Sequence, residues 1–126
     1  MTLYRKLHYL IQQPRIWQAV LYPLLAFILY LATSAQAYPV PSSANDKVNH
    51  VLAFLCLGIL MRWGYPKLLG IWSLSSLVAY GLGLELIQAF LPYREFSLLD
   101  LLADSAGAII GLWIGAWALH GKASRW

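Results

Sequence analysis

The chain has 126 residues, of which 60% are hydrophobic and 11% are charged, and its formal net charge is +4. Soluble domains carry about 25% charged residues, and a water-soluble domain of this size could not bury so much apolar surface. The basic residues are scattered between apolar runs and form no stripe, which argues against a nucleic-acid-binding protein. The composition therefore predicts one integral membrane domain over residues 1–126.

Four apolar segments, at about 17–33, 48–63, 68–91 and 98–119, are predicted to be transmembrane helices. A spanning helix needs about 20 residues, so the second segment is short for a full crossing. The segments lack the alternating pattern of a membrane β-barrel. We therefore predict an all-α bundle of about four transmembrane helices, preceded by a short interfacial helix within residues 1–15.

The first apolar segment has an alternative interpretation. A basic start, an apolar run and the sequence Ala35-Gln36-Ala37 together resemble a secretory signal peptide. The basic region is long for that role, and Pro23 interrupts the apolar run. We therefore expect a retained transmembrane helix and keep the signal peptide as the alternative.

The distribution of basic residues predicts the orientation, because four spans place both chain ends on one side of the membrane. That side would carry Arg5, Lys6, Arg15, Arg62, Lys67, Lys122 and Arg125, and the opposite side would carry Lys47 and Arg94. Loops rich in Lys and Arg stay in the cytoplasm. Both termini are therefore predicted to be cytoplasmic, and the acidic residues fall in the outer half.

Polar side chains on three of the segments are predicted to meet below the outer surface. With a rise of about 1.5 Å per residue, His50 lies about 6 Å past Asp46, Glu85 lies about 9 Å before Leu91, and Asp104 lies about 10 Å past Ser97. Ionisable groups in a membrane face the bundle interior or a wet cavity. We therefore expect one outward-facing polar pocket, with Gln88 and Asp100 one turn above Glu85 and Asp104.

Structural roles remain open for several of these residues. Asp46 could cap the second helix, and Ser97 with Asp100 fits a capping box at the start of the fourth. Glu85 and Asp104 have no helix end near enough to explain them, although both could be part of a structural polar lock. The alternatives for this pocket are therefore a functional site and a lock that holds the bundle together.

A metal site is a further alternative for the pocket. One histidine and several carboxylates could bind a hard divalent cation. The sequence contains no compact metal-binding motif such as H-E-x-x-H. We therefore assign no metal ligand and no cofactor from the sequence.

Gly107, Gly111 and Gly115 recur at intervals of four residues in the fourth segment. Small residues with this spacing let two helix backbones approach closely. Packing within the chain is the main interpretation. A homo-oligomer formed through these glycines is the alternative.

The order of the polar residues resembles the VanZ-like family of bacterial membrane proteins. The resemblance covers about residues 46–111 and rests on Asp46-Lys47-x-x-His50, Glu85-x-x-Gln88, Pro92-x-Arg94, Ser97-x-x-Asp100, Asp104 and Gly107. The position of Asp104 is often Asn in that family, so this chain has one acid more. The resemblance implies a multi-pass protein of the bacterial inner membrane and cell envelope. The family's namesake is linked to lowered susceptibility to teicoplanin, a glycopeptide that acts on cell-wall precursors.

These observations favour a pocket that binds or acts on a lipid-linked or cell-wall-related substrate. Glu85 is the candidate general acid or base and His50 the second proton carrier, while the Arg94 guanidinium suits an anionic group. The remaining polar residues would bind or orient the substrate: Asp46, Lys47, Gln88, Asp100 and Asp104. The alternative is a non-catalytic accessory protein that binds membrane lipids or a partner, so the sequence leaves open whether the protein is an enzyme. A transporter is disfavoured, because the polar residues do not continue into the inner half.

Overall fold

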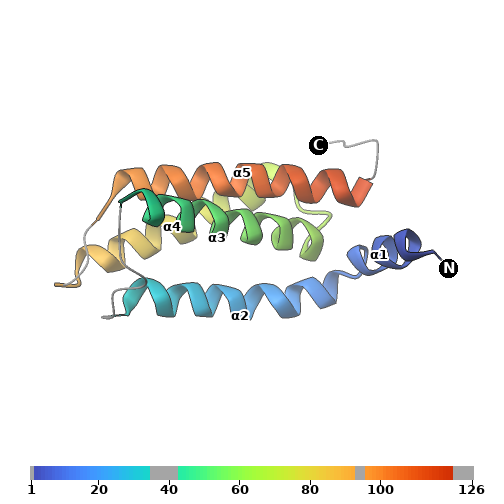
Figure 1. The fold of residues 1–126 in the computed structure, drawn as a ribbon, viewed down its shortest axis with the longest axis horizontal. Coiled ribbons are helices and arrows are strands. Elements are labelled where there is room, and N and C mark those ends of the chain that lie inside the picture. Colours follow the sequence, from blue (N-terminus) through green and yellow to red (C-terminus); the bar gives the residue numbers. More distant parts are fainter. Residues whose placement is uncertain (1, 35–42, 93–95, 121–126) are drawn as a thin grey trace.

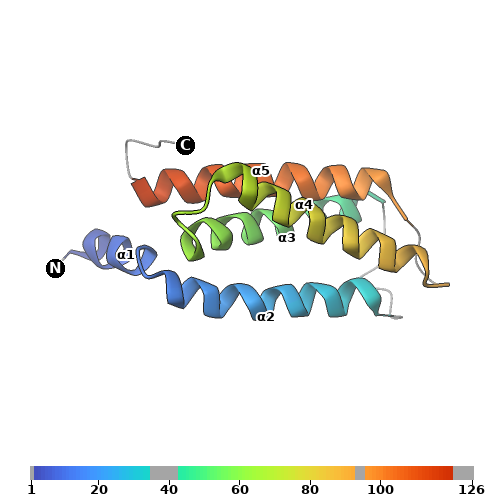
Figure 2. The ribbon, with the colours of Figure 1, turned by 180° about the vertical axis from the view of Figure 1, so that it is seen from behind.

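Five α-helices make up the described part of the chain. The computed structural model describes residues 2–34, 43–92 and 96–120, with only the backbone described for residues 43–46 and 120. The helices are α1 (Leu3–Ile11), α2 (Pro14–Thr33), α3 (Ser43–Gly64), α4 (Gly70–Ala89) and α5 (Leu98–His120). From α2 to α5, each helix runs antiparallel to the next, and α1 extends from one end of the bundle (Figures 1 and 2). The described residues contain no strand, so the all-α prediction is confirmed.

Local chemistry explains where several helices begin. The Thr2 hydroxyl accepts a hydrogen bond from the Arg5 amide at 3.3 Å and caps α1, the short helix expected within residues 1–15. Pro14 opens α2 at a position where its missing N–H costs no intrahelical bond. Helix α3 begins at Ser43 and has 22 residues, so it extends beyond the apolar segment at about 48–63 and includes the flank at Asp46. Asp46 lies within the first turn of α3, so the alternative that places it as the capping residue is wrong.

Three helices in the described residues are long and apolar enough to cross a membrane, namely α2, α4 and residues 98–119 of α5. Helix α3 is as long as these, but Lys47, His50 and Arg62 make it more polar near its two ends. It lies in the centre and contacts the other three long helices. These features indicate a multi-pass membrane protein with three clear spans.

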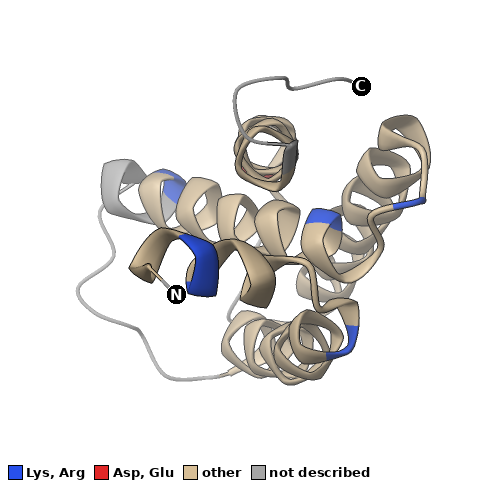
Figure 3. Cartoon of the chain, turned by 90° about the vertical axis from the view of Figure 1, so that its right-hand side faces the viewer, with Lys and Arg blue, Asp and Glu red and all other residues tan. Residues whose placement is uncertain are grey.

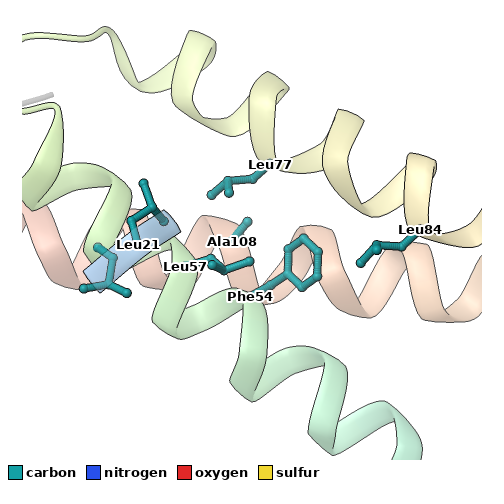
Figure 4. Close-up of a cluster of buried hydrophobic side chains, with 7 residues drawn as sticks. Leu21, Phe54, Leu57, Leu77, Leu84 and Ala108 are labelled. Atoms are coloured by element: carbon teal, nitrogen blue, oxygen red, sulfur yellow. The ribbon is translucent and has the colours of Figure 1, made fainter. Parts of the chain in front are cut away.

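Buried apolar side chains fill the centre of the bundle, while many others face outward. The core, drawn in Figure 4, contains Leu21 of α2, Phe54, Leu57 and Leu60 of α3, Leu77 and Leu84 of α4, and Ala108 of α5. Large apolar side chains such as Phe27, Leu86 and Trp113 are about half exposed. An apolar exterior of this kind suits lipid, because soluble proteins rarely expose large contiguous apolar patches.

The glycine stripe of α5 packs against α3. A Cβ atom at Gly107 would lie 2.4 Å from the Val51 carbonyl oxygen, and one at Gly111 would lie 2.2 Å from the Leu55 carbonyl oxygen. Both distances are too short for any side chain, so these glycines set the approach of the two helices. Gly115 also faces α3. The stripe therefore packs within the chain, as the main interpretation predicted, and oligomerisation remains a prediction that this stripe does not support.

The antiparallel arrangement separates the charges between the two ends of the bundle. The end formed by α1, the start of α2 and the turn after α3 carries basic residues, and blue segments are seen in the view onto it in Figure 3. We call it the basic end; it holds Arg5, Lys6, Arg15, Arg62 and Lys67. The opposite end is formed by the starts of α3 and α5 and the last turns of α4. We call it the acidic end; it holds Lys47, Glu85, Asp100 and Asp104.

Candidate functional site

The imidazole of His50, on α3, lies between two aspartates of α5. Its Nδ1 atom is 2.5 Å from Oδ1 of Asp104, and its Nε2 atom is 3.6 Å from Oδ2 of Asp100. Because an ionised carboxylate only accepts hydrogen bonds, Nδ1 is the donor to Asp104. Asp104 is fully buried, so this bond fixes both the tautomer and the orientation of the ring. The sequence prediction that His50 and Asp104 lie at one depth is thus matched by direct contact.

Gly81 of α4 makes room for this pair. A Cβ atom at Gly81 would lie 2.9 Å from Oδ2 of Asp104 and 3.3 Å from the ring of Phe54. A side chain at this position would therefore force the Asp104 carboxylate or the Phe54 ring to shift. The same contacts show that the apolar core begins directly beside the Asp104 carboxylate.

Glu85 of α4 binds the start of α5. Its side chain is fully buried, and its Oε2 atom accepts a hydrogen bond from the backbone N–H of Ser97 at 2.9 Å. The partial positive charge of a helix N-terminus favours a carboxylate there. The expectation that no helix end could explain Glu85 is therefore wrong, because the start of α5 is distant in sequence and adjacent in space. The other oxygen, Oε1, is buried and has no hydrogen-bond partner among the described residues.

Asp100 lies between His50 and the part-exposed side chain of Lys47. Its Oδ1 atom is 2.5 Å from Nζ of Lys47, whose side chain is 33% exposed. The predicted capping box is half correct, because the Ser97 hydroxyl accepts from the Asp100 backbone N–H at 3.2 Å. The Asp100 carboxylate contacts Lys47 and not the Ser97 N–H, to which the acidic residue of a capping box normally bonds. The Ser97 N–H donates to Glu85 instead.

The other predicted site residues differ in how far the structure places them. The Gln88 side chain is buried one turn after Glu85 and donates to the carbonyl oxygen of Ala32 at 2.9 Å. Gln88 therefore joins α4 to the end of α2. The side chain of Asp46 and the whole of Arg94 lie outside the described residues, so their roles remain predictions.

Ligand atoms of His50, Glu85 and Asp100 all lie within 4.8 Å of one another. Three helices thus bring a titratable nitrogen and two carboxylates into one cluster, with a fully buried carboxylate behind the histidine. Such a cluster can transfer protons, accept hydrogen bonds from a bound group or coordinate a cation. Sequence reasoning missed the Ser97 amide, because a backbone donor leaves no signal in residue type.

Comparison with known proteins gives a family. The family model described as VanZ/LLP1 matches residues 5–119. An uncharacterized protein of Schizosaccharomyces pombe is 36% identical over 98 residues, which cover 75% of this chain and 59% of the relative. This chain thus matches about three fifths of that relative's length. No solved structure gives a significant match. Because the family match runs from α1 to the end of α5 and includes the whole cluster, the chain belongs to the VanZ/LLP1 family.

Proposed function

We propose that the acidic end binds the polar headgroup of a membrane-embedded substrate and exchanges protons with it. One observation carries this proposal. Glu85 is fully buried, yet its Oε1 atom has no hydrogen-bond partner in the described part of the chain. A buried carboxylate oxygen without a donor costs more than about 1–3 kcal/mol, so a protein tolerates it where something else supplies the donor.

The neighbouring residues suit such a headgroup. Lys47 is part-exposed beside Asp100 and can attract an anionic group into the cluster. His50, oriented by Asp104, can take a proton from a hydroxyl of the substrate and return it. Glu85 would accept a hydrogen bond from the same group or transfer a second proton. The apolar outer faces of the surrounding helices would hold the hydrocarbon part.

The proposed topology has four spans, with the acidic end outside and both termini in the cytoplasm. Helix α3 has 22 residues, which is about 33 Å of helix and enough to cross a bilayer. Its polar ends lie where a spanning helix meets the interface. The excess of Lys and Arg at the basic end supports a cytoplasmic location for that end.

Cysteine labelling tests this orientation. In a Cys56→Ser background, Phe96→Cys marks the acidic end and Thr2→Cys marks the basic end, and both positions are exposed. A membrane-impermeant maleimide added to intact cells should label Phe96→Cys, while Thr2→Cys should react only after lysis. The reverse pattern, or labelling of both positions in intact cells, contradicts the proposed topology.

The family relationship helps to define which class of substrate we propose. The resemblance to bacterial VanZ-like proteins extends the proposal to lipid-linked cell-wall precursors, to the inner membrane and to an influence on teicoplanin susceptibility. The Schizosaccharomyces pombe relative shares 36% identity, so sequence similarity of this kind reaches a eukaryote. A lipid or lipid-linked headgroup is the substrate class that agrees with both.

A second candidate function is a non-catalytic accessory role, in which the cluster locks the bundle. The observation that favours it is bonding between helices, from His50 to Asp104 and from Gln88 to Ala32. Under this alternative the protein acts through a partner. A structural lock does not explain why the Oε1 atom of Glu85 is buried without a hydrogen-bond partner among the described residues. The accessory role is therefore the weaker candidate.

Native mass spectrometry distinguishes the two functions. The protein is extracted from its own membrane into nanodiscs as wild type, as Glu85→Gln and as a control, Gln18→Ala, at the basic end. Glutamine keeps an oxygen for the Ser97 N–H, so Glu85→Gln should fold. We expect one defined adduct on wild type and control, and about tenfold less on Glu85→Gln, as for one charged hydrogen bond. Equal bulk lipid on all three contradicts substrate binding and leaves the lock.

A further inference from the structure

We infer that His50, Glu85 and Asp100 form a binding site for a divalent transition-metal ion, with Asp104 orienting the histidine. Their ligand atoms lie within 4.8 Å of one another, and Nε2 of His50 is 3.6 Å from Oδ2 of Asp100. Ligands about 2.1 Å from a zinc ion lie about 3 to 4 Å apart. The most widely separated ligand atoms therefore need to approach each other by about 1 to 2 Å to share one ion.

The pairing of His50 with Asp104 is the first independent support. Metal-binding histidines usually donate their second ring N–H to a carboxylate, which fixes the tautomer and raises the basicity of the ligand nitrogen. Here Nδ1 contacts the fully buried Asp104 at 2.5 Å. This arrangement turns Nε2 toward Asp100, at a distance longer than a hydrogen bond.

The position of the Glu85 carboxylate is the second observation that supports the metal site. Its Oε2 atom is held by the Ser97 N–H at 2.9 Å, so the carboxylate cannot turn freely. Its Oε1 atom is buried with no hydrogen-bond partner among the described residues. An ion bound beside His50 and Asp100 would satisfy this oxygen. A proton on His50 would bridge the two aspartates and leave Oε1 unsatisfied.

The charges at the acidic end also favour a cation. Among the described side chains, three carboxylates (Glu85, Asp100 and Asp104) stand against the single ammonium group of Lys47. In the described part of the cluster, carboxylates thus outnumber ammonium groups, and a divalent ion would offset this excess.

The ligand types identify the class of ion. One imidazole nitrogen and two carboxylates suit zinc or manganese, whereas calcium and magnesium prefer oxygen ligands alone. Three protein ligands leave at least one coordination position open for water or a substrate oxygen. This inference goes beyond the proposed function but shares with it the Oε1 atom of Glu85. An ion on Nε2 of His50 would replace the proton that the proposed function assigns to this nitrogen, because Nδ1 already donates to Asp104.

Metal binding to the full chain, purified without a polyhistidine tag, tests the inference. Wild type, Glu85→Gln, Asp104→Asn and the control Ser73→Ala are stripped with a chelator and titrated with Zn²⁺ or Mn²⁺. Ser73 is buried on α4, 12 residues from Glu85, or about 18 Å along the helix. Elemental analysis gives the stoichiometry and calorimetry gives the Kd.

We expect one equivalent on wild type and on Ser73→Ala. Asp104→Asn should raise the Kd by about 10- to 100-fold, as for other residues that orient a metal-bound histidine. Glu85→Gln should raise it at least as much. No stoichiometric ion on wild type, or equal affinity in wild type and Glu85→Gln, would overturn the inference.

A measurement on wild type covers the case in which the variants do not fold. Circular dichroism and gel filtration show whether each variant keeps its helices and its size. Electron paramagnetic resonance of Mn²⁺-loaded wild type should then show coupling to a histidine nitrogen. A spectrum without nitrogen coupling overturns the site. A bound ion without any lipid adduct would retain the metal site and contradict the proposed function, so the two can fail separately.

Discussion

The two ends of the bundle satisfy their polar side chains in different ways. At the basic end, polar side chains donate to backbone carbonyls. The Gln18 amide donates to the carbonyl oxygen of Gly64 at 2.7 Å, and the Trp63 indole donates to that of Gly115 at 3.0 Å. These bonds join helix ends and give each side chain a structural purpose.

At the acidic end, charged side chains contact one another across helices. His50 meets Asp104 and Asp100, and Lys47 meets Asp100. One oxygen of Glu85 has no hydrogen-bond partner in the described residues. Buried polar networks stabilise a fold when every member is satisfied and cost stability when one is not. The buried Ser73 hydroxyl near the basic end also has no hydrogen-bond partner among the described residues, but it is neutral. The difference between the ends therefore lies in charge, because a carboxylate without a donor is costlier to bury than a hydroxyl.

The largest effect is expected from His50→Leu. This change leaves the buried carboxylate of Asp104 without its 2.5 Å partner, and removal of one member of a buried charged pair costs about 3–5 kcal/mol. The free energy of unfolding, measured by denaturant titration in mixed micelles, should fall by that amount. A fall of less than about 1 kcal/mol, the size of a surface pair, would mean that His50 and Asp104 are not coupled.

Substitutions in the glycine stripe of α5 should show the next largest effects on stability. The effect should be larger at Gly107, near the acidic end, than at Gly115, near the basic end. A Cβ atom at Gly107 would lie 2.4 Å from a backbone oxygen of α3, whereas one at Gly115 would come no nearer than 3.0 Å to a side chain. Gly107→Ala should cost about 1–3 kcal/mol, as for other overpacked sites, and should displace α5 beside His50. Gly115→Ala should cost less and leave ligand binding unchanged.

Gly83 provides the matched control for the glycine stripe, because a Cβ atom there meets nothing within 4 Å. Gly83→Ala should raise the free energy of unfolding by up to about 1 kcal/mol through helix propensity. Thermal unfolding of the three variants gives their order. If Gly107→Ala were as stable as Gly83→Ala, the close contact of α3 and α5 would be wrong.

Gln18→Ala should have a smaller effect, confined to stability. It removes the donor to the Gly64 carbonyl oxygen and should cost about 1 kcal/mol. Because Gln18 lies at the basic end, the amount of bound adduct should match wild type in native mass spectra. A loss of adduct in this variant would show that the two ends do not have separate roles.

Lys47→Met should have the smallest effect on folding. The Lys47 side chain is 33% exposed and its partner Asp100 is 9% exposed. Because water can reach the position of the ammonium group, the cost should lie near the upper end of the range of about 0–1 kcal/mol for exposed ion pairs. The effect should instead appear in binding: an anionic ligand should bind more weakly, and its affinity should depend less on salt concentration. Unchanged affinity and salt dependence would exclude Lys47 from the binding site.

Much of the arrangement could be predicted from residue types and spacing. Helical rise placed His50 and Asp104 at one depth, and they can meet because α3 and α5 both begin at the acidic end and run parallel. The spacing of Gly107, Gly111 and Gly115 predicted close packing, and the structure shows that the stripe faces α3. These features depend on helix geometry, which the sequence determines locally.

Other features depend on contacts between distant segments, and residue types do not report them. The Ser97 amide that binds Glu85 is a backbone group, so no side chain marks it in the sequence. The early start of α3 at Ser43 was missed because its first turns are polar and its apolar run begins later. Gln88 shares a helical face with Glu85 but bonds to α2, and only the packing of α2 against α4 decides this.

An experimental structure of the protein extracted in its own lipids would test the role of the acidic end most directly, at a resolution that shows side chains and bound molecules. We predict density that belongs to a lipid headgroup, an ion or both, within bonding distance of Oε1 of Glu85 and beside His50. If a side chain of the protein itself, such as Arg94, met Oε1 and no such density lay in the cluster, the acidic end would be a structural lock and the proposed site would be wrong.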